Sequence, residues 1–370
     1  CPVTHLPLIE VGEKLFEELD YQPARLAVVV HHCKLYGLPA AAERQVEPLA
    51  APLPPRVIEK SPASARLLAW MLVQKYRHHL PLYRQEEIFA REGLQIPRQT
   101  QCDWVLACAQ LLGPIQAALR RKILDSRLLQ LDDTPVQCQQ GRGSHKIQAY
   151  LWALLSPLVE GVVYDFTPGR GYDHVKAIVG DLQGILVGDG YAVHAKLAEQ
   201  SHGTLVTAGC WSHVLRKFRD ALPEAPREAA AMVVAIGALF AVEKAADDLH
   251  LSAAERLALR QARAPELLAE IDGRRRALAG RTSAQGQLAE ALGYLENQWP
   301  SLVRFLDDGR VPIHNNDCER AIRPIAVGRR NWLFAGSQRG GAAAATVYSL
   351  IESCRRAEVD PHAYLADVLR

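Results

Sequence analysis

The chain has 370 residues, of which 49% are hydrophobic and 23% charged, values typical of a folded globular protein with two or three domains. Its formal net charge of +2 excludes a general attraction to nucleic acid, so any DNA-binding surface must come from local clusters of basic residues. The sequence has no run of 18 apolar residues and no visible signal peptide, which argues against a membrane partner and predicts a cytoplasmic location.

Residues 1–50 predict a small β-rich segment, because LAVVVHHC (residues 26–33) contains consecutive β-branched residues. The segment also resembles a degenerate zinc-binding unit. Its candidate ligands lack the paired C-x-x-C spacing of a firm zinc site, so a structural zinc ion is doubtful; they are Cys1, His5, His31, His32 and Cys33. The eight cysteines are scattered, which fits reduced thiols. Since the sequence opens on Cys and not on Met, we expect a longer natural chain.

Residues 51–63 form a proline-rich linker, and residues 64–122 show the apolar spacing of helices. Gly93 predicts a helix stop, and Pro97 predicts the first position of the next helix. This outline is that of a helix-turn-helix, although many helical hairpins share it without binding DNA. The candidate DNA-contacting residues lie at the exposed start of the second helix: Arg98, Gln99 and Thr100.

Residues 123–220 predict an α/β unit. Three β-type runs separated by turn residues predict an antiparallel meander, followed by a helix and a buried strand. Asp132 is predicted at the end of the first strand and Asp189 at the end of the fourth. Two acids at neighbouring strand ends would meet at one edge of a sheet, but an Asp that ends a buried strand is also a common turn former.

A fifth strand runs into a basic helix that carries Cys210 and His213 in C-x-x-H spacing. Two ligands do not make a zinc site, and a packed cysteine with a hydrogen-bonded histidine explains them as well. Residues 221–307 are rich in Ala, Leu, Glu and Arg without a strand signal, which predicts three or four helices inserted into the α/β core. The core resumes at residues 308–357, and residues 358–370 form a carboxy-terminal tail.

The segment HNNDCERAIRPIAVGRRNWLFAG (residues 314–336) places Glu319 directly ahead of a cluster of arginines. Carboxylates can hold divalent metal ions and arginines can hold a phosphate backbone, the two needs of a site that cuts phosphodiesters. The alternative is a capping box formed by Asn316 and Glu319 beside a solvated basic face. Pro324 predicts that this element is short, because proline ends or kinks helices.

The motifs LDDTPV, VGDGY, CWSHVLRKF, HNNDCERAIRP and GRRNWLFAGSQRGG, in this order, resemble those of bacterial transposases of the insertion sequence 66 family. PLYRQEEIFAREG and DPHAYLADVL resemble the same family. The resemblance implies an Asp-Asp-Glu transposase with a ribonuclease H-like mixed-sheet core interrupted by the helical insertion. It assigns the catalytic and metal-binding acids to Asp132, Asp189 and Glu319, which are separated by 57 and 130 residues.

The resemblance further implies two Mg²⁺ (or Mn²⁺) ions that support cleavage and strand transfer of double-stranded DNA, at the element's terminal inverted repeats and at a target. It implies a homo-oligomer on DNA, since two element ends must be joined, and accessory proteins of the same element. Basic residues near the third acid are expected to contact DNA phosphates: Arg216, Lys217, Arg320, Arg323, Arg329 and Arg330.

The sequence departs from the family pattern at Asp133, where the family usually has Glu, so either Asp132 or Asp133 could be the metal ligand. Strand alternation alone leaves this open, and motif position favours Asp132. Two other functions fit the same motifs. One is a catalytically degenerate relative that only binds DNA, and the other is a non-specific metal-dependent nuclease of the same fold.

Overall fold

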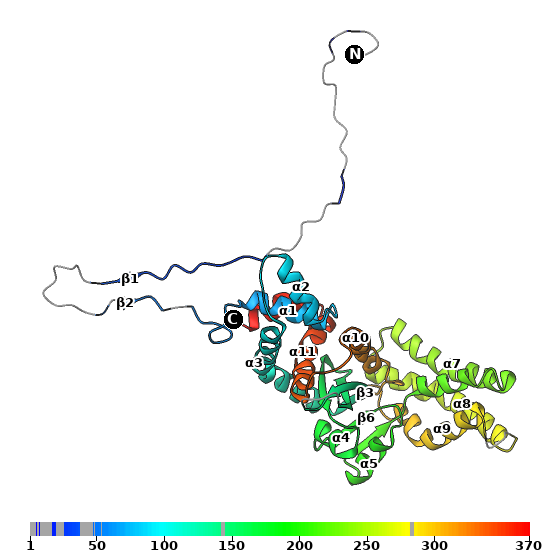
Figure 1. Cartoon of the computed structure of the whole chain (residues 1–370). Coiled ribbons are helices and arrows are strands. Elements are labelled where there is room, and N and C mark those ends of the chain that lie inside the picture. Colours follow the sequence, from blue (N-terminus) through cyan, green and yellow to red (C-terminus); the bar gives the residue numbers. More distant parts are fainter. Residues whose placement is uncertain are drawn as a thin grey trace. The chain divides into compact units, whose positions relative to one another are not determined.

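The computed structural model describes residues 5, 7, 17–19, 26–37, 47, 49–52, 54–141, 145–281 and 285–370 (Figure 1). The chain divides into two units, one of Cys1–Pro54 with Ile88–Gln95 and one of Pro55–Glu87 with Ile96–Arg370. In the first unit, strand β1 (Leu35–Tyr36) pairs antiparallel with β2 (Leu49–Ala50). The strand predicted for residues 26–33 is wrong. Val28 in this run is 91% exposed, so its β-branched residues pack on no core among the residues that the structure describes.

The second unit is built on a mixed sheet with strand order β5-β4-β3-β6-β7. Strands β3 (Leu128–Gln139), β4 (Lys146–Ser156) and β5 (Val159–Thr167) form the predicted antiparallel meander. Strands β6 (Gly184–Val187) and β7 (Leu205–Ala208) extend the sheet parallel to β3. The first four residues of β3 are all buried, as expected for a central strand covered on both faces.

The two faces of the sheet pack against different helices. Leu129 and Leu131 of β3 share one core with α4 (Tyr172–Val179) and α5 (Ala192–Gln200). Leu128, which points to the other face, shares a second core with α6 (Trp211–Asp220) and the helices that follow it. Helix α5 was not predicted, because its nine residues directly follow the turn after β6 and carry no strong capping signal.

The amino-terminal helices pack onto the carboxy-terminal ones. Helix α1 (Ala65–Tyr76) begins at Ser64, whose side chain accepts a hydrogen bond from the Leu67 N–H, and it packs against α12 (Pro361–Val368). The carboxy-terminal tail predicted for residues 358–370 therefore contains a helix. Helix α11 (Gln338–Arg356) contacts both α1 and α12 and covers β5 of the sheet.

Helices α2 (Leu82–Arg91) and α3 (Arg98–Asp125) occupy the predicted helical hairpin. Pro97 is the residue before α3 and not its first helical residue. The 28-residue α3 is much longer than a hairpin helix, and its second half packs on β5 and α11. At its start Arg98 and Gln99 are exposed and Thr100 is half-buried, so the predicted DNA-contacting residues lie on accessible surface, and their role stays a prediction.

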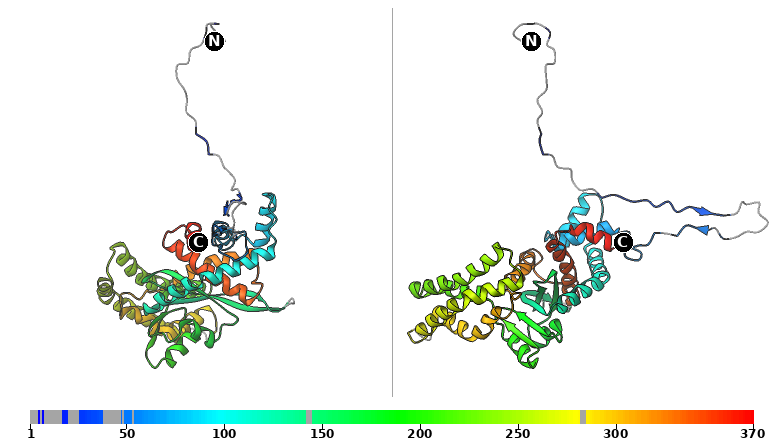
Figure 2. Two further views of the ribbon diagram at one scale, coloured as in Figure 1. Left: turned by 90° about the vertical axis from the view of Figure 1, so that its left-hand side faces the viewer. Right: turned by 180° about the vertical axis from the view of Figure 1, so that it is seen from behind.

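The block between α6 and residue 307 is helical in every segment that the structure describes there, as predicted. It contains α7 (Pro226–Asp248), α8 (Ala253–Ala279), α9 (Gln287–Leu302) and the 3-10 helix η1 (Val303–Leu306). Figure 2 shows α7 and α8 lying side by side. By length and composition α3 and α7 could cross a membrane, but α7 buries Met232, Ile236 and Leu239 in the second core, as a core helix does.

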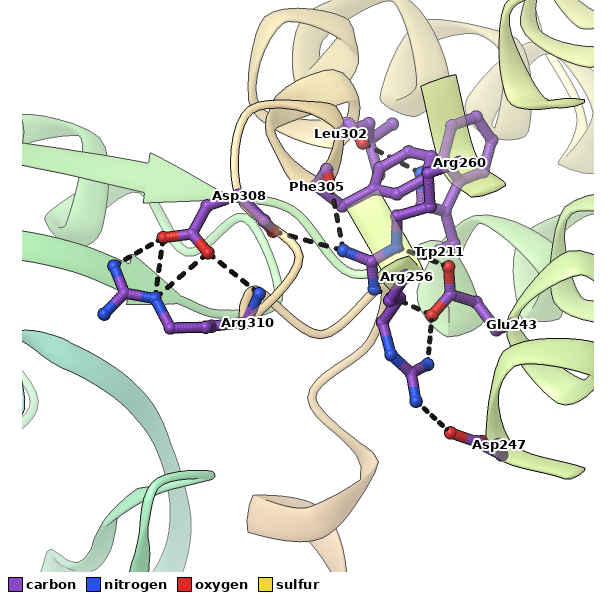
Figure 3. Close-up of polar contacts among 9 residues, drawn as sticks. All are labelled: Trp211, Glu243, Asp247, Arg256, Arg260, Leu302, Phe305, Asp308 and Arg310. Carbon is purple, nitrogen blue, oxygen red and sulfur yellow. Dashed lines mark hydrogen bonds and ion pairs between the residues drawn. The ribbon is translucent and has the colours of Figure 1, made fainter. Parts of the chain in front are cut away.

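A buried ion pair holds this helical block to the segment that follows it (Figure 3). The Arg260 side chain is 1% exposed and donates from Nε and Nη2 to the two carboxylate oxygens of Glu243, both at 2.7 Å. Its Nη1 donates to the backbone carbonyls of Phe305 and Asp308 at 2.9 and 3.2 Å. Arg256 adds a second cation at 3.0 Å from the same carboxylate. The pair therefore fixes the turn from which the chain returns to the sheet.

We expect Arg260→Ala to lower the free energy of unfolding by about 3 kcal/mol, because it leaves the buried Glu243 carboxylate with Arg256 as its remaining cation and removes the donor from the Phe305 and Asp308 carbonyls. The matched control is Arg274→Ala on the same helix, which removes an exposed pair with Glu270 and should cost less than about 0.5 kcal/mol. Denaturant unfolding followed by circular dichroism measures both. Equal, small effects would show that the buried pair does not stabilise the fold.

Candidate active site

Two of the predicted acids meet because β3 and β6 are parallel neighbours. Val187, the last residue of β6, is paired with Gln130 of β3, and Asp132 lies two residues further along β3. Asp189 lies two residues beyond Val187. The prediction that Asp132 ends its strand is wrong, since β3 continues to Gln139 in register with β4. Asp132 lies instead where β3 passes beyond its shorter parallel partner.

The packing of β3 separates Asp132 from Asp133. Alternate residues of a strand point to opposite faces, so Asp132 shares a face with Gln130, and Asp133 shares the other with Leu131. The Asp133 carboxylate, whose side chain is 7% exposed, accepts a hydrogen bond from Arg170 Nε at 2.5 Å. Asp133 is thus neutralised by an arginine, whereas the Asp132 side chain accepts from the Asp133 N–H at 2.8 Å. This geometry favours Asp132 as the free acid.

Asp189 sits in a tight turn between Gly188 and Gly190. Its Oδ1 accepts from the Tyr191 N–H at 3.1 Å, and its backbone carbonyl accepts from the Tyr294 hydroxyl at 2.7 Å. Gly190 has φ +80°, and a Cβ there would lie 2.7 Å from the Gln298 side chain, so the turn requires glycine. Tyr294 and Gln298 belong to α9, and no signal in the sequence linked this inserted helix to the site.

Glu319 reaches the site from α10 (Asn316–Trp332). The capping-box interpretation is wrong, because Asn315 is the N-cap, makes no side-chain cap, and Glu319 turns toward α6 instead. Its Oε2 accepts from Arg216 Nη2 at 3.2 Å, and its Oε1 lies 3.6 Å from His213 Nδ1, too far for a hydrogen bond. The expected short element is also wrong: α10 continues through Pro324, since tertiary packing of its apolar face outweighs one lost backbone bond.

The start of α10 is fixed by the fully buried Asn315. Its Nδ2 donates to the carbonyl of Leu131, the residue before Asp132, at 3.2 Å, and its backbone N–H donates to Cys210 Sγ at 3.2 Å. Gln130 Nε2 donates to the carbonyl of His314 at 3.0 Å. Asn315 and Gln130 therefore join the element that carries Glu319 to the strand that carries Asp132. Neither residue was predicted to take part in the site, although Asn315 lies inside the segment from His314 to Gly336.

The electrostatics of the site reflect crowded acids. The pKa of Asp132 is raised to about 7: burial is the largest cause, the nearby carboxylates of Asp189, Asp133 and Glu319 also raise it, and the hydrogen bond from the Asp133 N–H opposes the shift. Burial also raises the pKa of Asp133, while Arg170 opposes that shift. Four carboxylates from three separate elements therefore interact at one edge of the sheet.

The predicted DNA-contacting residues fall into two groups. Two of them make contacts within the protein. Arg329 donates to Thr134 Oγ1 and the Pro135 carbonyl at 2.8 and 2.6 Å, so it anchors α10 to β3. Lys217 is half-buried, with its Nζ 5.1 Å from the centroid of the Tyr294 ring. Arg320 pairs with Asp317. The exposed members of the set, which can reach a ligand, are Arg216, Arg320, Arg323 and Arg330.

The two segments with candidate zinc ligands differ in how far their side chains are buried. Cys210 is buried at the N-cap of α6, and His213 lies in its first turn, half-buried beside Glu319. In the amino-terminal segment, Cys1 lies outside the described residues, Cys33 is a half-buried free thiol, and His31 and His32 are exposed. The zinc interpretation of that segment stays a prediction.

Fold and site together define a mixed α/β protein with a carboxylate cluster where its parallel strands end. Residues 60–343 match the model of the family described as Transposase IS66 family, and the chain belongs to this family.

Similar proteins include three from Sinorhizobium fredii (strain NBRC 101917 / NGR234). Uncharacterized protein y4qI is 33% identical over 98% of this chain and 69% of its own length. Uncharacterized protein y4jD is 32% identical over 100% of this chain and 74% of its own length. Uncharacterized protein y4hP is 30% identical over 98% of this chain and 68% of its own length. The similarity covers both the sheet and the helical block.

We expect Asp132→Asn to stabilise the metal-free protein at pH 8 by roughly 2 kcal/mol. The folded-state pKa lies above the ordinary 3.8, so the native protein binds more protons than the unfolded chain between pH 3.8 and about 7. This carboxyl's contribution to stability is therefore lost as pH rises through that window, and the variant's advantage should vanish near pH 4.

Thermal unfolding in EDTA across this pH range measures the effect. The control is Asp181→Asn, because Asp181 is an exposed acid whose pKa is lowered by Lys176 and which should give no gain at pH 8. An advantage for Asp132→Asn that does not depend on pH would contradict the assignment of a buried, crowded carboxylate.

Proposed function

We propose that this protein is a DNA transposase that binds the terminal inverted repeats of its insertion sequence and catalyses metal-dependent strand cleavage and strand transfer. The observation that carries the proposal is that the carboxylates of Asp189 and Glu319, from the turn after β6 and from α10, raise the pKa of Asp132 on β3, in a chain of the IS66 transposase family. Three antiparallel strands followed by two parallel ones, in the order β5-β4-β3-β6-β7, support a ribonuclease H-like core.

The donor set of the site fits hard divalent cations. Transposases of this family generally need a divalent metal, and carboxylate oxygens are the ligands that Mg²⁺ and Mn²⁺ prefer. The pKa of Asp132 is raised first by burial and also by the neighbouring acids, both of which a bound cation would offset, and Glu319 Oε1 is buried without a hydrogen-bond partner in the described part of the chain. Asp132, Asp189 and Glu319 would hold two such ions, whose charge would favour attack by the oxygen nucleophile and departure of the 3′ oxygen.

The chain's own residues would orient these acids. Arg170 keeps Asp133 occupied, so that Asp132 alone faces the site. Tyr294 and the Tyr191 N–H fix the Asp189 turn, and Asn315 fixes the start of the helix that carries Glu319. Water would attack during cleavage and a 3′ hydroxyl during strand transfer, so the proposal needs no Ser, Tyr or Cys nucleophile.

The DNA surface is proposed along the exposed face of α10. Arg320, Arg323 and Arg330 are spaced three and seven residues apart, which places them along one side of the helix. Arg216 continues this surface beside Glu319. Such a row suits a phosphate backbone, since phosphates are met mostly by Arg and Lys. Recognition of the element ends would fall to the start of α3, at Arg98, Gln99 and Thr100.

The remaining assignments follow from this function. A homo-oligomer would hold the two element ends together, accessory proteins of the same element would assist, and the reaction would take place in the cytoplasm. The degenerate DNA-binding relative would bind element ends without cutting them. A non-specific nuclease would cut any DNA and join nothing.

We expect Asp189→Asn and Glu319→Gln to abolish Mg²⁺-dependent nicking of labelled DNA that bears the element's own ends. Their DNA affinity should stay within about tenfold of the parent's, because the lost carboxylate serves the metal and not the DNA backbone. Reactions in EDTA are the metal control. A variant that still cuts would remove its residue from the catalytic set, and cutting without joining would favour the nuclease.

A second prediction compares two arginines of α10. Arg323→Ala should weaken DNA binding and lower the slope of log affinity against log salt by about one, because one exposed phosphate contact is lost. Arg329→Ala should instead lower thermal stability, because its guanidinium anchors the helix to β3. Salt titrations of binding and melting curves of both variants test this. The opposite pattern would place Arg329, and not Arg323, on the DNA surface.

A further inference from the structure

Three side chains of different chemistry converge beside the carboxylate cluster. Cys210 precedes α6, His213 lies in the first turn of α6, and Glu319 projects from α10. One ligand atom from each, a sulfur, an imidazole nitrogen and a carboxylate oxygen, lies within 4.8 Å of the other two. We call this group the Cys-His-Glu trio.

Two atoms of the trio are buried and unsatisfied. His213 Nδ1 and Glu319 Oε1 face each other at 3.6 Å, and neither has a hydrogen-bond partner within the described part of the chain. A buried polar atom without a partner costs free energy, and binding of an ion removes that cost. Cys210 Sγ accepts only weak hydrogen bonds, including one from the Asn315 N–H at 3.2 Å. A cation bound by all three side chains would satisfy the two orphaned atoms.

The ligand chemistry selects a particular class of cation. Sulfur and imidazole ligands favour Zn²⁺, whereas the oxygen ligands of Asp132 and Asp189 favour Mg²⁺ or Mn²⁺. Two of the ligands have C-x-x-H spacing, which places both at the start of one helix. We propose that the Cys-His-Glu trio binds Zn²⁺, and that bound Zn²⁺ withdraws Glu319 from the catalytic set and inhibits cleavage.

The inhibition follows from the shared carboxylate. Oε2 of Glu319 is held by Arg216, and Oε1 is the oxygen that faces His213. A zinc ion on Oε1 would therefore leave Glu319 no unengaged oxygen for a hard cation. On binding, the Cys210 thiol gives its proton to solvent. Zinc binding itself needs no DNA and no catalysis, whereas the inhibitory consequence rests on the proposed transposase function.

The first experiment measures metal binding without DNA. The full chain, freed of metal, is titrated with Co²⁺ as a spectroscopic substitute for Zn²⁺. We expect a thiolate-to-cobalt charge-transfer band that saturates near one equivalent and that Zn²⁺ abolishes. Cys210→Ser should remove the band, and His213→Gln should weaken Co²⁺ binding at least tenfold. Melting curves confirm that each variant is folded.

Cys102→Ser is the matched control, because Cys102 is a half-buried thiol of α3 outside the trio and should leave the band unchanged. A second control, Cys33→Ser, tests the amino-terminal candidate ligands. No band in the parent protein, or a band that survives in Cys210→Ser, would overturn the proposed site.

The second experiment measures Mg²⁺-dependent nicking with increasing Zn²⁺, each variant normalised to its own rate without zinc. The parent and Cys102→Ser should be inhibited together, and Cys210→Ser should need at least tenfold more zinc. Equal inhibition of all three would overturn the regulatory role. Co²⁺ binding at the trio in a protein that never nicks DNA would support the metal site and contradict the transposase proposal.

Discussion

The parallel pairing of β3 with β6 is the constraint on which the site depends. Only three residue pairs join these strands, from Leu128 with Ile185 to Gln130 with Val187, yet they place Asp132 beside the Asp189 turn. β3 then continues along β4 after β6 has stopped. An acid beyond the end of a parallel neighbour meets no strand on that side, so it can approach other acids and stay within reach of ligands.

Crowding of acids works against stability, and the surrounding fold offsets it. Burial and like charges raise the pKa of Asp132, so its ionised form is unfavourable until a cation or proton arrives. The compensation lies in buried polar contacts around the site. Asn315 and Gln130 join α10 to β3, and Tyr294 reaches the Asp189 turn from the inserted helices. Arg260 secures the segment between these parts, so the helical insertion supports the site directly.

Glu319 lies between two kinds of ligand set. On one side are the carboxylates of Asp132 and Asp189, which suit hard cations. On the other are the sulfur of Cys210 and the imidazole of His213, which suit softer ones. In our proposals the third catalytic acid is therefore also the point at which a transition metal can interfere. Because the two sets differ in donor atoms, experiments with Mg²⁺ and Zn²⁺ can separate their effects.

The meander, the helical block and the family could all be predicted from the sequence, because β-branched runs, helical periodicity and ordered motifs are local signals. The sequence also marked Asp132, Asp189 and Glu319 as candidates. Tertiary structure separated the surroundings of Asp132 and Asp133, since only packing shows which face of β3 meets α10 and which meets Arg170, and Asp132 as the metal ligand stays a prediction. Tertiary contacts also explain why Arg329 binds the Pro135 carbonyl and why α10 continues past Pro324. The β-branched run at Val28 is exposed and forms no strand. These outcomes depend on contacts between residues far apart in the chain, which local propensity cannot encode.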